Sequence, residues 1–317
     1  MNKDVIRIYF ATDVHGSDKC WRKLVNVRNF YKVDAVILGG DLTGKAIVPI
    51  IRQPDGSYES SFMARHWRLQ TEDQVKEHEE VISNSGLYPY RTTPEEVHEL
   101  SINKIKMDEL FKRLIIERMR KWLEIAEASL KDKGIKIIVT PGNDDDPMID
   151  DLIRESEVIL NSEGKVVEIA GKYEMISSGW SNPTPWRTPK ECSEEELEKK
   201  IDDMVSKLKN VSHSIFNLHV PPYGSGLDSA PQLDENLKPV DAGQRLVPVG
   251  STAVLNAVTK YQPLLGLHGH IHESKNAIKI GKTICLNPGS NYSEGMLMGV
   301  IVNIENGRVK NYIFTSG

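Results

Sequence analysis

The stretch that organises this chain is Gly266-Leu267-His268-Gly269-His270-Ile271-His272, directly after the apolar run Pro263-Leu264-Leu265. The apolar run is typical of the end of a buried strand, and the glycines let the backbone pass close to another group. His270 and His272 are two residues apart, so an extended backbone projects both imidazoles to the same side. Such a strand end either offers two nitrogens to metal ions or packs as a polar strand end against its neighbours. The rest of the sequence decides between these interpretations.

The composition predicts a globular chain with a full core. With 317 residues, 39% of them apolar, it is expected to be one large domain, or one domain with a sizeable insertion. A net charge of -5 disfavours a surface for nucleic acid or for an acidic membrane. The three cysteines are far apart, which argues against a disulfide framework or a structural zinc site. The sequence shows no apolar signal core and no stretch of membrane-spanning length, so we expect a cytoplasmic location and no membrane partner.

Polar donors follow successive apolar strands along the chain. Residues 5–11 lead into Asp13-Val14-His15, and residues 35–38 lead into Gly39-Gly40-Asp41. In a parallel α/β sheet the carboxyl ends of the strands share one edge, where chemistry collects. The same pattern recurs at three later strands. The donors that it delivers are Asp13, His15, Asp41, Asn143, His219, His270 and His272.

An excursion from this pattern follows the second strand. Residues 47–52 and 57–69 flank Pro54-Asp55-Gly56, which predicts a hairpin with a less regular second arm. A long helical pattern comes next, before the strands return. We therefore expect a single domain over residues 1–317 that carries an inserted hairpin-plus-helix region at about residues 45–134.

The inserted helix begins with Thr93 as its N-cap and Pro94 as its first residue. Apolar residues at helical spacing continue to about Lys133, with mixed charges between them. We expect one long amphipathic helix, or the same helix broken near Asn103. Its apolar stripe packs either on the body, as a wall of the site, or on a second copy of the chain in a homodimer.

The donor set indicates which metals it would hold. Carboxylate, amide and imidazole donors together suit Mn, Fe, Co, Ni or Zn, whereas oxygen donors alone would indicate Mg or Ca. Seven protein donors are too many for one catalytic ion that must keep an open position. The sequence therefore predicts two divalent metal ions as the cofactor.

Five short blocks occur in order, each after an apolar strand: Asp13-x-His15, Gly40-Asp41, Gly142-Asn143, His219-x-Pro221-Pro222 and Gly269-His270-x-His272. In this order they resemble the blocks of the calcineurin-like metallophosphoesterase superfamily, and they look closer to its bacterial and archaeal phosphodiesterase-like members. The resemblance covers most of the chain. It implies an α/β fold, a two-sheet β-sandwich flanked by helices in four α/β/β/α layers, with a dinuclear centre on one edge.

The resemblance also implies a mechanism. Two cations a few ångströms apart lower the pKa of a bridging water, which yields a hydroxide for in-line attack on phosphorus. The same ions neutralise charge that builds on the phosphoryl oxygens. By position, one metal would be held by Asp13, His15 and His272, the other by Asn143, His219 and His270, and Asp41 would bridge them.

The sequence departs from the family pattern at Asp144. Many members carry there a histidine thought to protonate the leaving group, whereas a carboxylic acid beside two cations is expected to be ionised. Either the leaving group needs little help, or another residue serves, or Asp144 positions a water or a substrate group. His268 is the candidate substitute, with the alternative that it hydrogen-bonds a neighbour of the metal site. Asp145 and Asp146 are expected to cap the following helix rather than to bind metal.

Further aromatic and basic residues are candidate substrate contacts. Trp180 and Trp186 lie in a proline-rich loop, where an aromatic ring either stacks on a nucleobase or packs within the loop. Arg245 lies in the long irregular segment 223–247, where it either clamps a phosphate oxygen or forms a surface ion pair. Trp180 and Arg245 are therefore the candidate substrate residues.

Taken together, these patterns predict a hydrolase. We expect a dinuclear-metal-dependent phosphoesterase acting on a small phosphoester, with diesters favoured over monoesters and nucleotides among the substrates considered. A nuclease acting on DNA ends is one alternative, disfavoured by the acidic net charge and the lack of a basic tract. A non-catalytic metal-binding scaffold or interaction protein on the same fold is another. Such a protein is expected to have lost ligands, and all seven donors are present.

Overall fold

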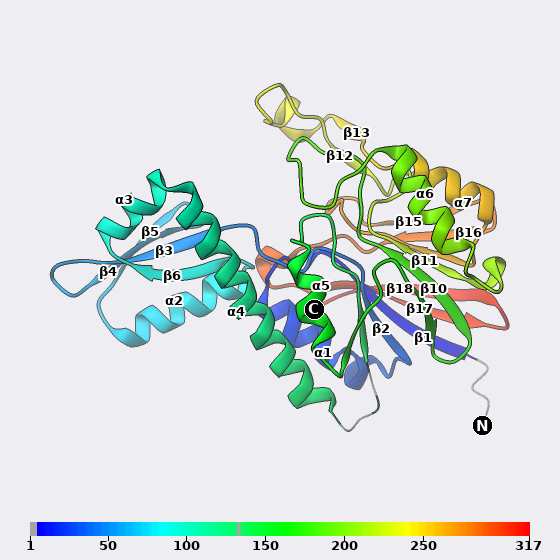
Figure 1. Cartoon of the computed structure of the whole chain (residues 1–317), viewed down its shortest axis with the longest axis horizontal. Helices are drawn as coiled ribbons and strands as arrows, with labels where there is room; N and C mark the ends of the chain where they lie inside the picture. The colour runs from blue at the N-terminus through cyan, green and yellow to red at the C-terminus, as the bar shows by residue number, and fades with distance from the viewer. Residues whose placement is uncertain (1–4, 132–133, 135) are drawn as a thin grey trace.

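Two six-stranded sheets packed face to face form the body of the molecule (Figure 1). The computed structural model describes residues 5–131, 134 and 136–317. Across the first sheet the strands are β18 (Arg308–Ser316), β17 (Met298–Glu305), β1 (Val5–Ala11), β2 (Ala35–Leu38), β7 (Ile137–Val139) and β8 (Ile159–Asn161). Across the second they are β15 (Asn276–Ile280), β16 (Thr283–Asn287), β14 (Leu265–Leu267), β11 (Ile215–Leu218), β10 (Tyr173–Ser178) and β9 (Val166–Ile169). The central strands of each sheet run parallel, so their carboxyl ends share one edge.

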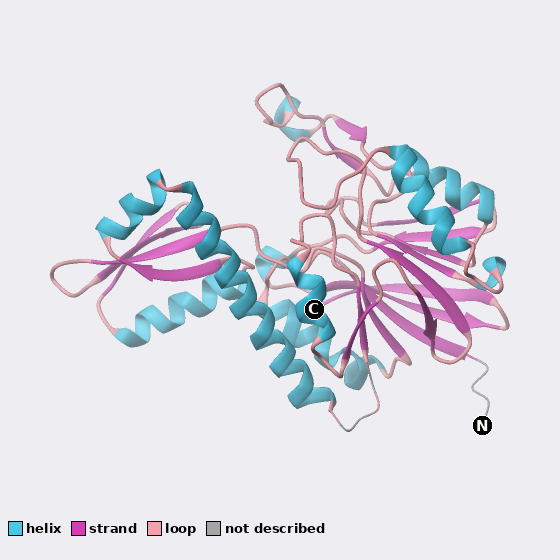
Figure 2. Cartoon of the chain, in the orientation of Figure 1, coloured by secondary structure: helices cyan, strands magenta, loops and turns pink. Residues whose placement is uncertain are grey.

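Helices cover the outer face of each sheet (Figure 2). Those on the first sheet are α1 (Asp18–Tyr31), α4 (Lys104–Leu130) and α5 (Met148–Arg154), and those on the second are α6 (Glu194–Val205) and α7 (Thr252–Tyr261). Strand β1 shows the alternation, since Ile8 and Phe10 enter the core between the sheets whereas Tyr9 packs against the helices. The predicted four-layer α/β/β/α sandwich is confirmed.

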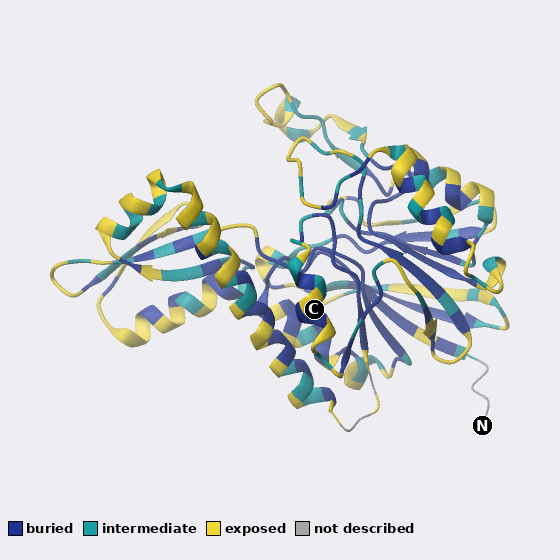
Figure 3. Cartoon of the chain, in the orientation of Figure 1, coloured by how far each residue is buried: buried dark blue, intermediate teal, exposed yellow. Residues whose placement is uncertain are grey.

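Local sequence signals set the ends of several elements. The Ser17 side chain caps α1 by accepting from Cys20 N, and Ser193 and Glu196 form the capping box of α6. Strands β17 and β18 turn at Asn306-Gly307, whose φ angles of 50° and 70° suit a two-residue hairpin. All four residues of β2 are buried, as expected for a strand covered on both faces (Figure 3).

A smaller sheet lies to one side of the body (Figure 1). Its strands in order are β5 (Arg65–Leu69), β4 (Tyr58–Phe62), β3 (Ile47–Arg52) and β6 (Tyr88–Thr92), with helices α2 (Glu72–Asn84) and α3 (Pro94–Ile102). The hairpin predicted at Pro54-Asp55-Gly56 is present, but its second arm is two strands because Met63 and Ala64 form another turn with positive φ. Helix α2 and strand β6 are not predicted from the sequence, although the Thr71 and Gln74 capping box is a signal for α2.

The helix predicted over about residues 93–133 is broken. Asn103 lies between α3 and α4 and caps α4, because its side-chain oxygen accepts from Lys106 N. The alternative of a break near Asn103 is therefore confirmed. Helix α4 ends at Leu130, and the predicted end at Lys133 lies outside the described residues. Within the described part of the chain, no helix is both long and apolar enough to cross a membrane.

The segment 223–247, predicted to be irregular, takes part in a ribbon of two short paired strands. They are β12 (Ser229–Pro231) and β13 (Leu246–Pro248). Only three residues pair in each strand, so neither a strand nor a helix period is visible in the sequence. We call this feature the β12–β13 ribbon.

Helix α4 is anchored on the body through an aromatic pair. Trp122 is fully buried and stacks on Trp21 of α1, with the ring centroids 4.7 Å apart. Trp21 Nε1 donates to the Trp122 carbonyl at 2.9 Å, and Trp122 Nε1 donates to Asp18 Oδ1 at 2.7 Å. Both indole N–H groups thus keep a hydrogen-bond partner inside the core, which makes the pair a favourable place to bury two large rings.

Trp122→Ala is expected to lower the free energy of unfolding by about 3–5 kcal/mol, because it leaves a cavity between α1 and α4. Trp186→Ala is the matched control. The Trp186 side chain is 64% exposed, so its loss is expected to change stability by less than about 0.5 kcal/mol. Urea denaturation followed by circular dichroism measures both values. Equal midpoints for the two variants would contradict the anchoring role of Trp122.

Candidate metal centre

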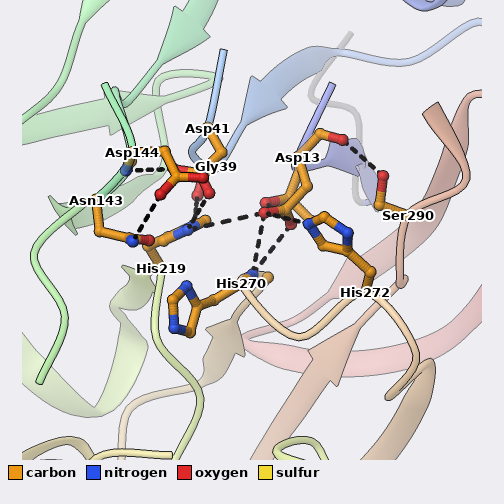
Figure 4. A network of polar contacts seen from close by, with 12 residues as sticks. Asp13, Gly39, Asp41, Asn143, Asp144, His219, His270, His272 and Ser290 are labelled. Atoms are coloured by element: carbon orange, nitrogen blue, oxygen red, sulfur yellow. Dashed lines mark hydrogen bonds and ion pairs between the residues drawn. The ribbon is translucent and has the colours of Figure 1, made fainter. Parts of the chain in front are cut away.

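Side chains from five strand ends meet at the edge where the two sheets join (Figure 4). The loops after β1, β2 and β7 supply donors from the first sheet, and those after β11 and β14 supply donors from the second. All seven donors named in the sequence gather there: Asp13, His15, Asp41, Asn143, His219, His270 and His272. Most of them are almost inaccessible to solvent, which removes the competing water that would weaken their electrostatic interactions.

The donors form two adjoining groups whose ligand atoms lie within 4.8 Å of one another: Asp13, His15 and His272 in one, and Asp41, His219 and His270 in the other. In the first group His15 Nε2 is 3.0 Å from His272 Nε2. Between the groups, His219 Nε2 is 3.4 Å from Asp41 Oδ2 and 3.8 Å from Asp13 Oδ1. Two carboxylates therefore share one imidazole at the boundary of the groups.

Two of the atoms that could bind a metal, Asn143 Oδ1 and His219 Nε2, are buried and have no hydrogen-bond partner among the described residues. Leaving a buried polar atom unsatisfied costs about 1–3 kcal/mol. His219 Nδ1 lies 2.9 Å from the Gly39 carbonyl and donates to it, so Nε2 is the nitrogen that can bind a metal once its proton is displaced. Asn143 Nδ2 donates to Thr188 Oγ1 at 2.9 Å, which leaves its oxygen as the free acceptor. Free amide and imidazole donors beside buried carboxylates fit divalent cations.

Motif glycines make room for these donors. A Cβ on Gly142 would lie 2.1 Å from Asp41 Oδ1, and one on Gly269 would lie 2.5 Å from Asp13 Oδ2. Both distances are too short for non-bonded atoms, so only glycine allows this approach. Four of the seven donors hold positive φ angles, an uncommon conformation that clusters at functional sites. The angles are 54° at Asp13, 36° at His15, 46° at Asp41 and 65° at His270.

Comparison with known proteins gives one related sequence and several related folds. No family model matches the chain. An uncharacterized protein of Methanocaldococcus jannaschii, MJ1162, is 33% identical over 178 residues, which cover 55% of this chain and 73% of that protein. The structure of TT1561 of Thermus thermophilus has a TM-score of 0.55 at 14% identity and covers 98% of both chains. A structure described as a novel archaeal phosphodiesterase is more distant, with a TM-score of 0.35 at 13% identity. The match covers 98% of this chain and 100% of that one.

Five motif blocks, separate in the sequence, form one cluster on a two-sheet sandwich. In these blocks the chain resembles the calcineurin-like metallophosphoesterase superfamily. Its identity and coverage with the Methanocaldococcus jannaschii protein make the two members of one family. The likeness to TT1561 shows a shared fold alone.

Charges in this site are strongly coupled. Burial alone would raise the pKa of Asp41, but His219 and His15 hold it well below its usual range. Burial alone would lower the pKa of His219, but Asp41 and Asp13 raise it to about 10. For His15 burial prevails and lowers the pKa to about 3. In the ion-free chain a proton on His219 thus balances part of the charge of the two carboxylates.

Lys45 is a site residue that is not predicted from the sequence. Its Nζ is 2.5 Å from Asp144 Oδ2, and Asp144 N donates to Asp41 Oδ1 at 3.0 Å. Burial and the Asp41 carboxylate raise the pKa of Asp144 to about 6, against the opposing charge of Lys45. Asp144 therefore lies beside the donors, as expected from its place in the motif, but it is paired with a lysine. No motif marks Lys45, because its loop leaves the family pattern after Asp41.

Asp145 connects two motif loops, and the prediction that it caps the following helix is wrong. Its carboxylate accepts from Leu42 N at 2.9 Å and from Gly142 N at 2.7 Å. The loops after β2 and β7 are thereby held in register. The neighbouring Asp146 does lie at the start of α5, where it accepts from Met148 N at 3.0 Å.

Four of the donors, Asp41, Asn143, His270 and His272, line a cleft of about 1310 Å³. One wall of the cleft is formed by Phe111 and Ile115 of α4. The other walls are formed by the loop 183–189, which carries Trp186, and by the β12–β13 ribbon. The inserted helix was expected to form either a wall of the site or a homodimer face. The first half of α4 forms a wall of the site. The homodimer face stays a prediction.

Three sequence candidates are absent from the described lining of this cleft. His268 is fully buried with Nδ1 2.8 Å from the Leu218 carbonyl, and burial lowers its pKa to about 4. This placement does not favour His268 as a proton donor to a substrate. Lys200 Nζ lies 4.2 Å from the ring centroid of Trp180, which packs against the core beneath α6. Arg245 is exposed next to β13.

Divalent metal binding is expected to release protons and to strengthen as pH rises. His219 has a pKa of about 10 in the ion-free chain, above its usual value, so near neutral pH a metal must displace its proton. Calorimetric titration with Mn²⁺ in two buffers of different ionisation enthalpy measures the release. His219→Ala is expected to reduce it, whereas the exposed His98→Ala is the control. Affinity that does not change between about pH 6 and 9 would contradict this assignment.

Asp145→Asn is expected to weaken metal binding roughly 10- to 100-fold. Both carboxylate oxygens accept hydrogen bonds, Oδ1 from Thr43 N and Thr43 Oγ1 and Oδ2 from Leu42 N and Gly142 N, and an amide nitrogen cannot replace either oxygen as an acceptor. Asp146→Asn is the neighbouring control and removes only a contact at the start of α5. Metal titration of the two variants, with circular dichroism to confirm folding, compares them. Equal metal affinity in the two variants would contradict the role of Asp145 in positioning the donors.

Proposed function

We propose that this chain is a metal-dependent phosphoesterase with a dinuclear centre, and that it prefers phosphodiesters to phosphomonoesters. The observation that carries the proposal is the pair of buried donor groups, with free amide and imidazole atoms, whose members Asp41, His270 and His272 line a large cleft. A structural polar cluster would satisfy its own hydrogen bonds. Here the donor atoms remain available to cations and, through them, to a substrate in the cleft.

Each donor is held in place by the chain. By the resemblance, Asp13, His15 and His272 would hold one cation, Asn143, His219 and His270 the other, with Asp41 between them. When bound, two such ions supply an activated water and neutralise the phosphoryl oxygens. The chain supplies the orientation, since Gly39 fixes the His219 ring and Thr188 fixes the Asn143 amide. The mixed donor set supports Mn, Fe, Co, Ni or Zn, with manganese the first ion to test.

The charges beside the donors support a diester substrate. The half-exposed Lys45 lies against Asp144. Partial desolvation would lower the pKa of Lys45, but the Asp144 and Asp41 carboxylates raise it, so Lys45 keeps its proton. A monoester dianion would bring a second negative charge near the Asp144 carboxylate, whereas a diester carries one. A diester also has a second ester group, for which the cleft has room. Lys45 offers the leaving oxygen a fixed positive charge rather than a transferable proton, which suits good leaving groups.

The alternative functions receive less support from the site. A non-catalytic scaffold has no need to keep seven donors gathered with free ligand atoms. A nuclease needs a basic track beside the site, and the cleft combines Lys45 and Lys112 with several carboxylates, among them Asp108, Glu194 and Glu273.

Bis-p-nitrophenyl phosphate is expected to be hydrolysed faster than p-nitrophenyl phosphate by chelator-treated protein to which Mn²⁺ is returned. Asn143→Ala is expected to lose at least about 100-fold of this activity, because it removes a metal donor. Asn26→Ala, on the exposed face of α1, is the matched control.

The absorbance of released p-nitrophenolate measures the hydrolysis of both substrates. Faster hydrolysis of the monoester would refute the proposed preference for diesters but would still support a phosphoesterase. Hydrolysis that is unaffected by chelator and by Asn143→Ala would refute the dinuclear mechanism itself.

A further inference from the structure

The cleft extends well beyond the metal donors. Its volume of about 1310 Å³ exceeds that of a typical small-molecule site, roughly 300–1,000 Å³. A phosphate group with two small substituents would leave most of it empty. The walls away from the donors are largely apolar, with Phe111 and Ile115 on α4, Trp186 on the loop and Val247 and Pro248 on the β12–β13 ribbon. The cleft is therefore shaped for a substrate with a bulky group attached to its phosphate.

Trp186 is an aromatic ring presented to this cleft. It lines the cleft yet is 64% exposed, whereas tryptophan side chains are highly buried on average. The loop that carries it is fixed, because Thr184 Oγ1 and Thr188 Oγ1 both donate to Glu191, at 2.6 and 2.7 Å. Thr188 also accepts from the metal donor Asn143. One loop thus sets both the position of a metal donor and the position of an exposed ring.

Two of the residues that line the same cleft carry an unsatisfied acceptor atom. Asn182 Oδ1 and Gln232 Oε1 are buried and lack a hydrogen-bond partner within the described chain. The Asn182 amide nitrogen faces the carbonyls of Val249 and Gly250, at 3.4 and 3.5 Å, which leaves its oxygen free. Acceptors of this kind call for a ligand that brings N–H or O–H donors. A fatty chain has none, whereas a nucleoside has sugar hydroxyls and base N–H groups.

We propose that the substrate is a nucleoside phosphodiester, with its base stacked on Trp186 and its hydrogen-bond donors directed to Asn182 and Gln232. The proposal rests on the phosphoesterase function above and names the substrate class of that site. In the reaction, water adds to phosphorus and the bond from phosphorus to the leaving oxygen breaks. One proton of the water passes to solvent, and the other reaches the leaving oxygen through solvent, which releases an alcohol, or stays in solvent where the leaving group is a nitrophenolate. A nucleoside monophosphate remains.

The test compares two diesters with the same leaving group, thymidine 5′-(p-nitrophenyl phosphate) and methyl p-nitrophenyl phosphate, in the presence of Mn²⁺. We expect kcat/KM for the nucleoside ester to be roughly 10- to 100-fold higher, the range that base stacking on an aromatic ring provides. Trp186→Ala is expected to remove this ratio, and Trp186→Phe to restore most of it. Trp180→Ala is the matched control from the same loop, because Trp180 lies against Lys200 and should leave the ratio unchanged.

Equal kcat/KM for the two esters, or a ratio that survives Trp186→Ala, overturns the proposal. A larger gain with n-decyl p-nitrophenyl phosphate also overturns it and assigns the cleft to a lipid. If neither ester is hydrolysed, the phosphoesterase function fails and binding is measured separately. Binding is measured as the quenching of tryptophan fluorescence by adenosine 5′-monophosphate. Quenching that is absent with ribose 5-phosphate and is lost in Trp186→Phe would support the nucleoside site without supporting the phosphoesterase function. Equal quenching by both compounds would refute it.

Discussion

Burial of two carboxylates is the constraint on which this site depends. Asp13 and Asp41 are almost inaccessible to solvent, and buried charges cost several kcal/mol each unless opposite charge compensates them. Both carboxylates lie on loops of the first sheet, whereas His219 and His272, which face them, come from the second. The two sheets must therefore meet at this edge for either carboxylate to be tolerated. His270 N adds a direct bond to Asp13 at 3.0 Å.

The inserted sheet is connected to the same edge through Arg118 of α4. This guanidinium is buried and donates to the Leu87 carbonyl at 3.2 Å, to Ser83 Oγ at 3.1 Å and to the Gly16 carbonyl. Gly16 directly follows His15, so one side chain contacts both the inserted region and a donor loop. Because Arg presents several donors in a fixed fork, it can hold three backbone and side-chain acceptors at once. Helix α4 thus both contacts the inserted sheet region and forms a wall of the cleft.

The strand-end donors could be predicted because their signals are local. Each lies within a few residues of an apolar run, and parallel strands place such ends on one edge whatever the rest of the fold does. The same holds for Ser17, Ser193 and Asn306-Gly307, whose capping and turn chemistry acts over two to three residues. Helix α2 has such a signal as well, in the Thr71 capping box, and its prediction was within reach of the sequence.

The sequence by itself determined which strand ends carry the seven donors, and it left a break near Asn103 as one alternative, since strand-end spacing and caps are set by neighbours along the chain. The two-sheet sandwich was implied by the resemblance of the five blocks to a known family. Only the tertiary structure decided that Lys45 lies against Asp144, that Asp145 joins two motif loops and that Trp186 rather than Trp180 lines the cleft. Each of these depends on which distant segment approaches the residue. Two tryptophans six residues apart in one loop look alike in sequence, and the difference between them arises because α6 covers one ring while the other is left facing the cleft.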